Sequence, residues 1–457
     1  MLKNRFSLRT AHALRENFES ARKPYQVQIR RGVVKNVQPK RAHYSRKDVF
    51  RHVPKIMRKI LLEIAKWTLA QCKPQNLFKN VFEKKSLCGF ERIAVISIGK
   101  ASRGMAKEVL KMLPKKPDAL LFADSGHPLP TKKSVKNTQK IIKLARSLGK
   151  KDLSIILISG GGSAMLTCPV PFIALNDKIN ITKALLKSGA TINEMNVVRK
   201  HLSQVKGGNL AALFYPATVF GFVISDVVGN DLSTIASGPI SPDKSTFSDA
   251  IRILKKYNIA APKKVWAYLK QRTHDKKLET PKKGSKYFEK INIKILADHS
   301  TVLKNAADRA RKLGLKIKIV PKLITGEARH AAKIFVKMAR PKTLIIAGGE
   351  TTVTCRGKIW KGCGGRNQEF VLSGLKYLKP NQTLLSIGTD GVDGICPEKI
   401  AGAIADKKIL TSAQKQNLKI EDFLKRNDSY TFFKKTKGLI ATGPTGTNLG
   451  DLMMLFS

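Results

Sequence analysis

The sequence predicts an α/β protein built on mostly parallel sheets. Short apolar runs bounded by glycine, aspartate or proline recur along the chain, and 20 or more residues with helical periodicity separate most of them. Continuous apolar strands alternating with helices are typical of parallel sheets that are covered on both faces. The 457 residues, at roughly 150 per domain, are enough for two or three domains with hydrophobic cores of their own.

The first element is a basic N-terminal extension over residues 1–50, which contains 13 basic and three acidic residues. Its composition fits either a disordered basic extension or a mitochondrial transit peptide. From about Lys47 apolar residues recur at a spacing of three to four. We therefore expect a helix, in which the residues at this spacing are Val53, Ile56, Ile60, Leu61, Ile64 and Trp67.

The strands follow in order after this helix. Each apolar run is short enough for a strand and is flanked by turn residues. The expected strands are 92–99, 118–124, 153–159, 217–226, 292–298, 316–320, 343–349 and 382–390. Between residues 271 and 290 a Lys- and Pro-rich stretch has no apolar periodicity, so we expect a connection there. This places an N-terminal domain at 51–290 and a C-terminal domain at 291–457.

Composition limits the possible classes of protein. Lys and Arg exceed Asp and Glu by 54, and this excess is spread along the whole chain. A dispersed lysine excess fits a solvated surface or an enzyme of anionic substrates, although it also raises the possibility of nucleic-acid binding. No run approaches the ~18 to 20 apolar residues of a membrane span. The six cysteines form no CxxC pair, which indicates reduced thiols in an intracellular protein and no zinc site.

In open α/β sheets ligands bind at the carboxyl ends of strands, so the residues after each run are the candidates for chemistry. Strand 153–159 ends in Ser159, followed by the glycines Gly160, Gly161 and Gly162 and then by Ser163. Backbone N–H groups without neighbouring Cβ atoms can contact phosphate. A tight strand-to-helix turn is an alternative explanation of the same glycine sequence. After strand 92–99, Lys100 follows Gly99 and is positioned to neutralise charge on a phosphoryl oxygen.

Further candidates lie downstream. Lys206, Gly207 and Gly208 form a second basic glycine turn, which is either a phosphate contact or the end of an amphipathic helix. Asp226 directly follows strand 217–226, and Asp390 and Asp393 sit in a GTDGVDG turn. Carboxylates at such positions suit Mg²⁺ carried with ATP, or a base that accepts a hydroxyl proton, while Asp-Gly is also ordinary turn chemistry.

The last candidate cluster spans 347–370. Glu350 follows a strand, and GGRNQEF opens a helix with Arg366 in its first turn. The planar fork of an arginine matches a carboxylate or a phosphate, and a structural salt bridge is the alternative. Near the C-terminus, ATGPTGTNLGDL adds another strand and a Gly/Thr turn.

Taken together these motifs resemble the glycerate 2-kinase family, the class II glycerate kinases with a MOFRL-type C-terminal domain. The motifs that carry the resemblance occur in order between residues 55 and 455: LISGGGSAML, SGATINEMNVVRKHLSQVKGGNLA, ISDVVGNDLSTIASGPISPD, GGETTV, GGRNQEF, GTDGVDG with AGAIAD, RNDSYTFF and GPTGTNLGD. The resemblance implies ATP-dependent phosphorylation of D-glycerate at its 2-hydroxyl group. It also implies a larger Rossmann-like N-terminal domain and a smaller α/β C-terminal domain with the active site in the cleft between them.

The same resemblance implies roles for individual residues. The lysine of GKA and the arginine of GRNQE, here Lys100 and Arg366, serve phosphoryl transfer in the family, and Arg366 could instead bind the glycerate carboxylate. We expect the loop from Ser159 to Ser163 and the turn 206–208 to bind nucleotide. Asp226 is the expected proton acceptor or metal contact, and Asp390 and Asp393 are expected to contact Mg²⁺.

Three motifs depart from the family pattern. Asn230 replaces the first Asp of SDVVGDD, which would weaken Mg²⁺ binding if that carboxylate were a ligand. Thr131 stands where an acid is common, and Asp298 and His299 replace a small residue and Asn.

Two other functions are alternatives to the kinase. Relatives of this family have been labelled hydroxypyruvate reductases, but the G-x-G-x-x-G fingerprint of a nicotinamide enzyme is absent from the sequence. A basic nucleic-acid-binding protein is the second, but aromatic residues make up only 7% and no RNA-binding signature occurs. We expect a cytoplasmic monomer or homodimer, mitochondrial if residues 1–50 are a transit peptide, with no membrane or specific nucleic-acid partner.

Overall fold

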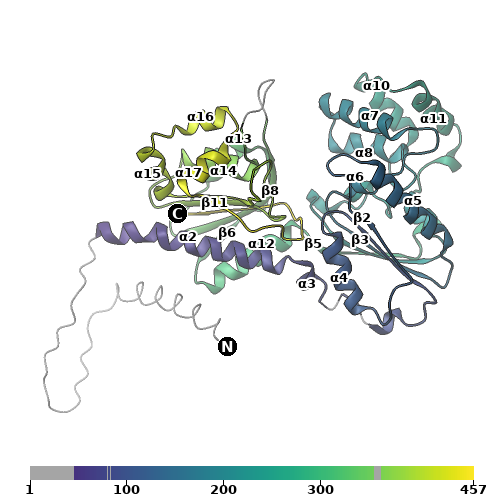
Figure 1. Ribbon diagram of the computed structural model, residues 1–457, viewed down its shortest axis with the longest axis horizontal. Helices are drawn as coiled ribbons and strands as arrows, with labels where there is room; N and C mark the ends of the chain where they lie inside the picture. The colour runs from purple at the N-terminus through teal and green to yellow at the C-terminus, as the bar shows by residue number, and fades with distance from the viewer. Residues whose placement is uncertain (1–45, 80, 83, 355–361) are drawn as a thin grey trace, which may run out of the picture.

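The computed structural model describes residues 46–457 except 80, 83 and 355–361. It has two α/β lobes, each built around one sheet (Figure 1). The predicted basic extension lies almost wholly outside the described residues.

The first lobe contains a five-stranded sheet in the order β2-β1-β3-β4-β5, and all of its pairs are parallel. Its strands are β1 (Ile93–Ile98), β2 (Ala119–Ala123), β3 (Leu153–Ile158), β4 (Thr218–Ile224) and β5 (Ile291–Ala297). β1 and β3 are buried along their whole length, which explains their continuous apolar sequences. The chain first moves from β1 to β2 and then returns to the other side of β1, so the topological switch point lies between β1 and β3.

Helices cover both faces of this sheet. α4 (Ser102–Met112) packs on one face, while α5 (Lys132–Ser147) and α9 (Asn209–Phe214) pack on the other. A group of helices with its own hydrophobic cluster lies beyond α5 and contains α7 (Leu175–Lys187), α8 (Ile192–His201), α10 (Phe247–Lys256) and α11 (Lys263–Thr273). The short helices of this lobe are α3 (Pro74–Leu77), η1 (Lys84–Leu87), α6 (Gly162–Met165), η2 (Val228–Asn230), η3 (Ile235–Ser237), η4 (Lys276–Leu278) and η5 (Lys286–Phe288).

The second lobe contains a mixed seven-stranded sheet in the order β11-β10-β9-β12-β8-β6, with β7 also paired to β8. Its strands are β6 (Lys316–Ile319), β7 (Ile324–Glu327), β8 (Thr343–Thr352), β9 (Thr383–Gly388), β10 (Gly402–Ala405), β11 (Leu439–Ile440) and β12 (Asp451–Phe456). β12 runs antiparallel between β8 and β9. The start of β12 therefore lies at the same sheet edge as the ends of its two neighbours.

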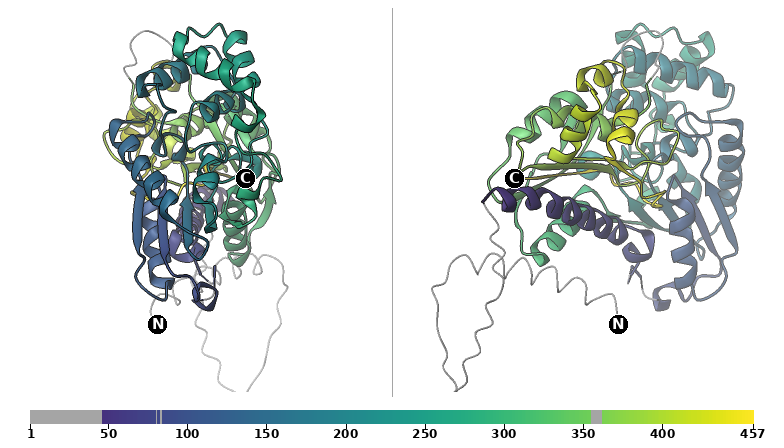
Figure 2. Two further views of the ribbon diagram at one scale, coloured as in Figure 1. Left: turned by 90° about the vertical axis from the view of Figure 1, so that its right-hand side faces the viewer. Right: turned by 60° about the vertical axis from the view of Figure 1, so that its left-hand side comes forward.

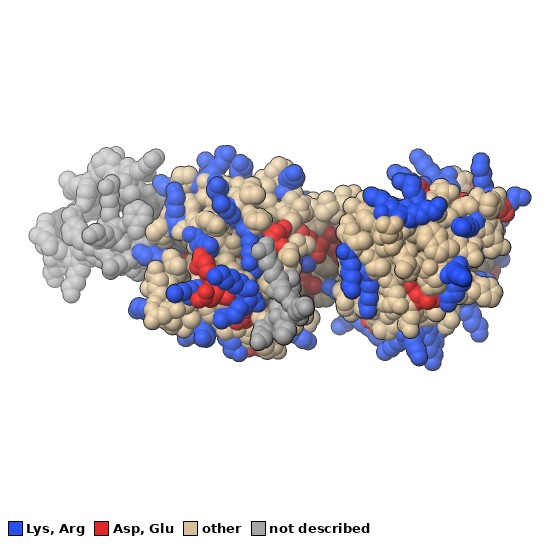
Figure 3. Space-filling view, turned by 90° about the horizontal axis from the view of Figure 1, so that it is seen from above, with Lys and Arg blue, Asp and Glu red and all other residues tan. Residues whose placement is uncertain are grey.

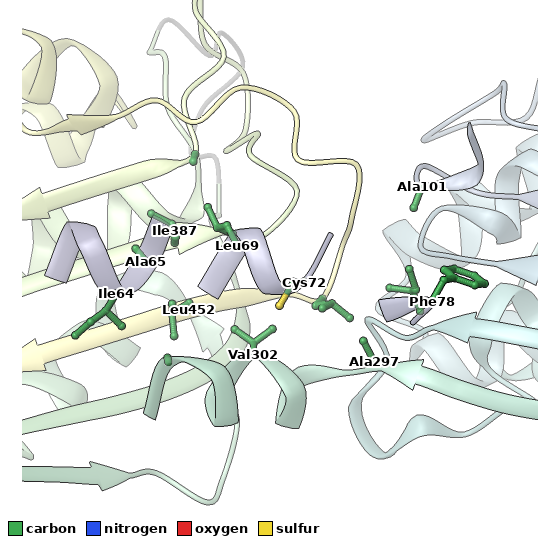
Figure 4. Packing of buried hydrophobic residues seen from close by; sticks show 14 of the residues in the cluster. Ile64, Ala65, Leu69, Cys72, Phe78, Ala101, Ala297, Val302, Ile387 and Leu452 are labelled. Carbon is green, nitrogen blue, oxygen red and sulfur yellow. The ribbon is translucent and has the colours of Figure 1, made fainter. Parts of the chain in front are cut away.

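Two helical layers sandwich the second sheet (Figure 2). One layer contains α13 (Ala328–Lys337), α14 (Arg366–Leu375), α15 (Lys407–Lys415), α16 (Ile420–Lys425) and α17 (Ser429–Thr436). The other contains α12 (His299–Lys312) and the long α2 (Arg46–Gln71). Figure 4 shows Ile64, Ala65 and Leu69 of α2 beside Ile387 and Leu452 of the sheet.

The packing differs from the predicted domain division in two places. β5 pairs with β4, Val219 opposite Ile291, so the first lobe extends through Ala297 rather than ending at 290. α2 precedes the first lobe in sequence but packs on the second, where Arg58 pairs with Asp406 at 3.2 Å. The Lys- and Pro-rich stretch is a connection as predicted, but it lies inside the first lobe. No helix among the described residues is both long and apolar enough to cross a membrane.

Candidate active site

The first wall of the site is the switch point of the parallel sheet. Gly99 ends β1 with φ +104°, and any Cβ there would collide with Ser159. The backbone N–H of the next residue, Lys100, donates to the Gly160 carbonyl at 2.9 Å, which joins the two loops. The Lys100 Nζ then reaches across to the second lobe, 3.4 Å from Asp390 Oδ2.

The predicted phosphate loop has more than one role. The Ser159 hydroxyl is buried, accepts the Ala101 N–H at 3.0 Å and donates to the Ile98 carbonyl at 3.1 Å. It therefore holds the loop together and does not face a ligand, contrary to the prediction. Gly160 backs onto Asp226 and Asn448, so a side chain at this position would separate the lobes. Gly161 lies against His127 and Lys100, while Gly162 is buried against η3.

Asp226 follows β4 and lies beside the same cleft, next to the lining residue Asn448. It accepts a hydrogen bond from Asn448 Nδ2 of the second lobe at 2.8 Å. Burial, followed by the nearby Glu350, raises the pKa of Asp226 to about 6, although Lys100 and Arg366 act in the opposite direction. At neutral pH the carboxylate is ionised and more basic than an ordinary aspartate. This suits a group that accepts a hydroxyl proton.

The second wall is built around Arg366 at the start of α14. Its Nε and Nη2 donate to the two oxygens of Asp451 at 2.7 and 3.0 Å, and its Nη1 donates to Glu350 at 2.7 Å. Burial works against the charged guanidinium, but Asp451 and Glu350 outweigh it and raise the pKa of Arg366. The salt-bridge alternative thus describes part of its role, and Arg366 also lines the cleft.

The two predicted metal contacts have different surroundings. Asp393 is buried and accepts the backbone N–H groups of Asn367 and Gln368 at 3.0 and 2.9 Å, as well as their side-chain amides. Four donors occupy its oxygens, so it anchors the first turn of α14 rather than offering a ligand position, contrary to the prediction. Asp390 contacts Lys100 and accepts the Val392 N–H at 3.0 Å.

Both walls enclose a cavity of about 820 Å³. It is lined by Lys100 and His127 from the first lobe and by residues of the second lobe that include Glu350, Arg366, Asp390, Asp393, Asn427, Thr447 and Asn448. Figure 3 shows acidic side chains beside the groove between the lobes, while Lys and Arg are spread over both surfaces. The dispersed positive charge therefore does not form one groove in this view.

The turn 206–208 lies away from this cavity. The N–H groups of Gly207 and Gly208 donate to the carbonyls of Ser237 and Gly238 at 3.0 and 2.7 Å, so they hold the backbone and are unavailable to a nucleotide, contrary to the prediction. Lys206 is 1% exposed and lines a second, smaller cavity together with Ser163.

Sequence reasoning missed three residues of this region. Asn448 and His127 line the main cavity, where Asn448 donates to Asp226 and His127 lies against Gly161. Asp451 is not a lining residue but accepts hydrogen bonds from Arg366. Asn448 and Asp451 belong to the GPTGTNLGD motif, so the motif was visible while the partners were not.

The departure at Asn230 has a structural explanation. Its Nδ2 donates to Asp298 Oδ2 at 2.6 Å, so two of the departing residues meet where the chain passes from β5 into α12. Burial opposes ionisation of Asp298, but hydrogen bonds from Ser300 and Asn230 outweigh it and lower its pKa. Asn230 does not line the main cavity described above, and it connects the first lobe to the first turn of α12.

We expect Asn230→Asp to lower the free energy of unfolding by about 1–2 kcal/mol, because a donor to a carboxylate is replaced by a second carboxylate. The loss should be larger at pH 7 than at acid pH, where protonation of a carboxylate removes the repulsion. Urea unfolding measures it. Adding Asp298→Asn restores a donor and an acceptor and should recover most of the stability; a single variant as stable as the native chain would contradict the assignment.

The fold and the site define a class, a two-lobed α/β protein with cationic and acidic side chains facing one cleft at a topological switch point. Comparison with known proteins identifies the family. Residues 60–270 match the family model described as a domain of unknown function, DUF4147, and residues 343–451 match the MOFRL family. The chain is 35% identical over 430 residues to the D-glycerate 2-kinase of Thermotoga maritima, covering 88% of this chain and 98% of that protein. It belongs to the glycerate 2-kinase family.

Other relatives agree with this placement. The glycerate 2-kinase of Pyrococcus horikoshii is 35% identical, covering 79% of this chain and 87% of that protein. A protein of Agrobacterium vitis with the provisional name hydroxypyruvate reductase is 38% identical, covering 79% and 86%. The crystal structure of the Thermotoga maritima glycerate kinase superposes with a TM-score of 0.77 at 34% identity, covering 88% of this chain and all of that one.

Proposed function

We propose that this protein transfers the terminal phosphoryl group of ATP to the 2-hydroxyl group of D-glycerate, giving 2-phosphoglycerate and ADP. The observation that carries the proposal is the convergence of Lys100 and Asp226 from one lobe with Arg366 and Asp390 from the other. Family membership supports the reaction, because the relatives from Thermotoga maritima and Pyrococcus horikoshii are named glycerate 2-kinases.

The residues divide the work of the transfer. The Asp226 carboxylate accepts the proton as the 2-hydroxyl oxygen bonds to phosphorus and ADP departs. Lys100 stabilises the charge on the transferred oxygens, and Arg366, held in place by Asp451 and Glu350, presents its remaining N–H groups to the same region.

The carboxylates of the cavity fit a Mg²⁺ ion carried by the nucleotide. Glu350 accepts Arg366 at one oxygen, whereas Asp390 accepts the Val392 N–H at one oxygen and lies 3.4 Å from the Lys100 ammonium group at the other. Carboxylate oxygens are ligands that Mg²⁺ prefers. Glu350 and Asp390 would therefore hold the ion, which neutralises phosphate charge when bound. No group of three or more metal-ligating side chains occurs in the described part of the chain, so phosphate oxygens would supply much of the coordination.

The protein is proposed to act in the cytoplasm. Cys72, Cys168, Cys363 and Cys396 are free thiols, which fits a reducing cytoplasm, whereas Cys355 lies outside the described residues. The protein acts there on small molecules as a monomer or a homodimer.

The direct test is incubation of the purified full chain with ATP, Mg²⁺ and D-glycerate, with the product identified by ³¹P NMR. We expect 2-phosphoglycerate, and no product when D-glycerate is omitted. Formation of 3-phosphoglycerate would overturn the regiochemistry, and NADH-dependent reduction of hydroxypyruvate without any phosphorylated product would overturn the reaction.

We expect kcat/KM to fall at acid pH with an apparent pKa of about 6, because Asp226 must be ionised to accept the proton. The sign follows from the direction of the shift: the raised pKa means that protonation begins to inactivate the base at a higher pH than for an ordinary aspartate. Asp226→Asn should lower activity at every pH and remove this limb. A limb that persists unchanged in the residual activity of the variant would assign it to another group.

A further inference from the structure

The first lobe contains a second cavity, of about 270 Å³, beside the switch point. It lies between the loop after β3 and helices α7 and α8, which are neighbours in Figure 1. Three cations line it, Lys178, Arg199 and Lys206, together with the hydroxyl groups of Ser163, Thr167 and Thr182. None of its described lining residues is acidic.

The cations of this cavity have no counter-charge. Lys206 is 1% exposed, and among the described residues its Nζ donates only to the Ala236 carbonyl, at 3.4 Å. Lys178 is 5% exposed and donates to the carbonyls of Arg199 and Leu202 at 3.2 and 3.0 Å. The Arg199 side chain makes no hydrogen bond or ion pair within the described part of the chain, and burial lowers its pKa.

A neighbouring buried lysine, unlike these three cations, has a carboxylate partner. Lys200 is 6% exposed and pairs with Asp243 at 3.0 Å, and Asp243 in turn accepts Thr280 and Ser245. Burial of an unpaired charge costs several kcal/mol, so three unpaired cations together are unfavourable for the folded state without a ligand. Burial, then repulsion from Arg199, lowers the pKa of Lys178 to about 7, and burial lowers that of Lys206 too.

The size and charge of the two cavities favour different substrates, the nucleotide in the larger cavity and the small acid in the smaller one. The 820 Å³ cavity holds Glu350 and Asp390, which repel a bare carboxylate and accept a metal-bound nucleotide. The smaller cavity is too small for a whole nucleotide, and its cations attract a small acid. His127 lines both cavities, and Gly161, which lines the smaller one, lies against Lys100. The smaller cavity therefore adjoins the loop against which Lys100 lies.

We propose that the pocket formed by Lys178, Arg199 and Lys206 binds the carboxylate of the small hydroxy-acid substrate, with the Arg199 fork on the carboxylate oxygens. This rests on the proposed function, because D-glycerate is the acid concerned. Under this proposal Arg366 does not bind the glycerate carboxylate, because its guanidinium group already donates to Asp451 and Glu350. The assignment makes Arg199 and Lys206 binding residues outside the interlobe cavity.

The test is isothermal titration of the full chain with D-glycerate alone and with Mg²⁺-ADP alone. Arg199→Met and Lys206→Met should each weaken D-glycerate binding about tenfold or more, the usual loss for a charge-assisted hydrogen bond, and change Mg²⁺-ADP binding by less than about twofold. Lys183→Met is the matched control, because it removes an equal charge from an exposed position on α7. It should change neither affinity.

Thermal unfolding separates binding from structure. Removing a buried, unpaired charge should leave the Tm of Lys206→Met unchanged or raise it, so weaker binding could not come from unfolding. Variants that weaken Mg²⁺-ADP and spare D-glycerate would overturn the proposal in favour of nucleotide phosphate, and variants that change neither ligand would make the cations structural. If D-glycerate binds through Arg199 but no phosphorylated product forms, the kinase proposal fails while the pocket assignment stands.

Discussion

Replacement of Lys100 by alanine is expected to lower kcat by a factor of about 10² to 10³, the usual cost of removing one group that stabilises charge in a transition state. Lys100 is the second residue after β1, and its ammonium group lies in the cleft beside Asp390. Its charge is most useful when the phosphoryl group is in transit, so kcat should fall more than the KM of either substrate rises. Steady-state kinetics with both substrates varied measures the division.

Lys107→Ala is the control for Lys100, because Lys107 is an exposed lysine of the same helix region, on α4. It should stay within about twofold of the native kcat, as surface substitutions usually do. Retention of near-native turnover by Lys100→Ala would show that its ammonium group does not contact the transferred phosphoryl group. Circular dichroism confirms that both variants are folded.

Arg366→Ala is expected to abolish most activity and also to destabilise the second lobe by about 3–5 kcal/mol, the cost of leaving a buried charge without its partner. Asp451 is 1% exposed and loses both hydrogen bonds from the guanidinium. Arg366→Lys should not restore activity, since an ammonium group cannot reproduce a bidentate fork. Denaturant unfolding and turnover are measured on the same preparations.

The destabilisation by Arg366→Ala should grow with pH. Burial already raises the pKa of Asp451 to about 6 with Arg366 present. Removal of the Arg366 guanidinium, which lowers this pKa, raises the pKa of Asp451 further. When the pKa of a carboxyl group is higher in the folded than in the unfolded protein, the free energy of unfolding falls as pH rises between those two pKa values. The loss should therefore be smaller near pH 5 than near pH 8.

A second substitution separates the structural from the catalytic role of Arg366. Asp451→Asn in the Arg366→Ala background removes the buried charge and should recover most of the stability without recovering activity. If activity returned with stability, Arg366 would act only by holding the fold.

Much of the fold could be predicted because buried strands have a direct sequence signature. The eight predicted strands match β1 to β6, β8 and β9, whose central residues are mostly apolar. β7 and β10, with the sequences ITGE and GAIA, are short and contain small residues, so no periodicity reveals them. The helical pattern from Lys47 predicted an amphipathic helix, but an apolar face does not specify which sheet it will cover.

The candidate site could be predicted in composition but not in pairing. Lys100, Asp226, Arg366 and Asp390 reach the cleft because they follow or precede strands and helices whose ends meet there. Ser159 and Asp393 have the same residue types and similar positions, yet backbone donors and acceptors occupy their side chains. A local pattern cannot distinguish a free carboxylate from one that caps a helix.

The sequence by itself determined the α/β class, the family and the residues gathered at the strand ends, because hydrophobic periodicity and turn chemistry are local properties of the chain. Only the tertiary structure decided where β5 and α2 belong and which charges have partners. Lys200 has Asp243 while Lys206, six residues later, has no carboxylate. That difference depends on distances between segments far apart in the chain, and packing of the whole lobe sets those distances.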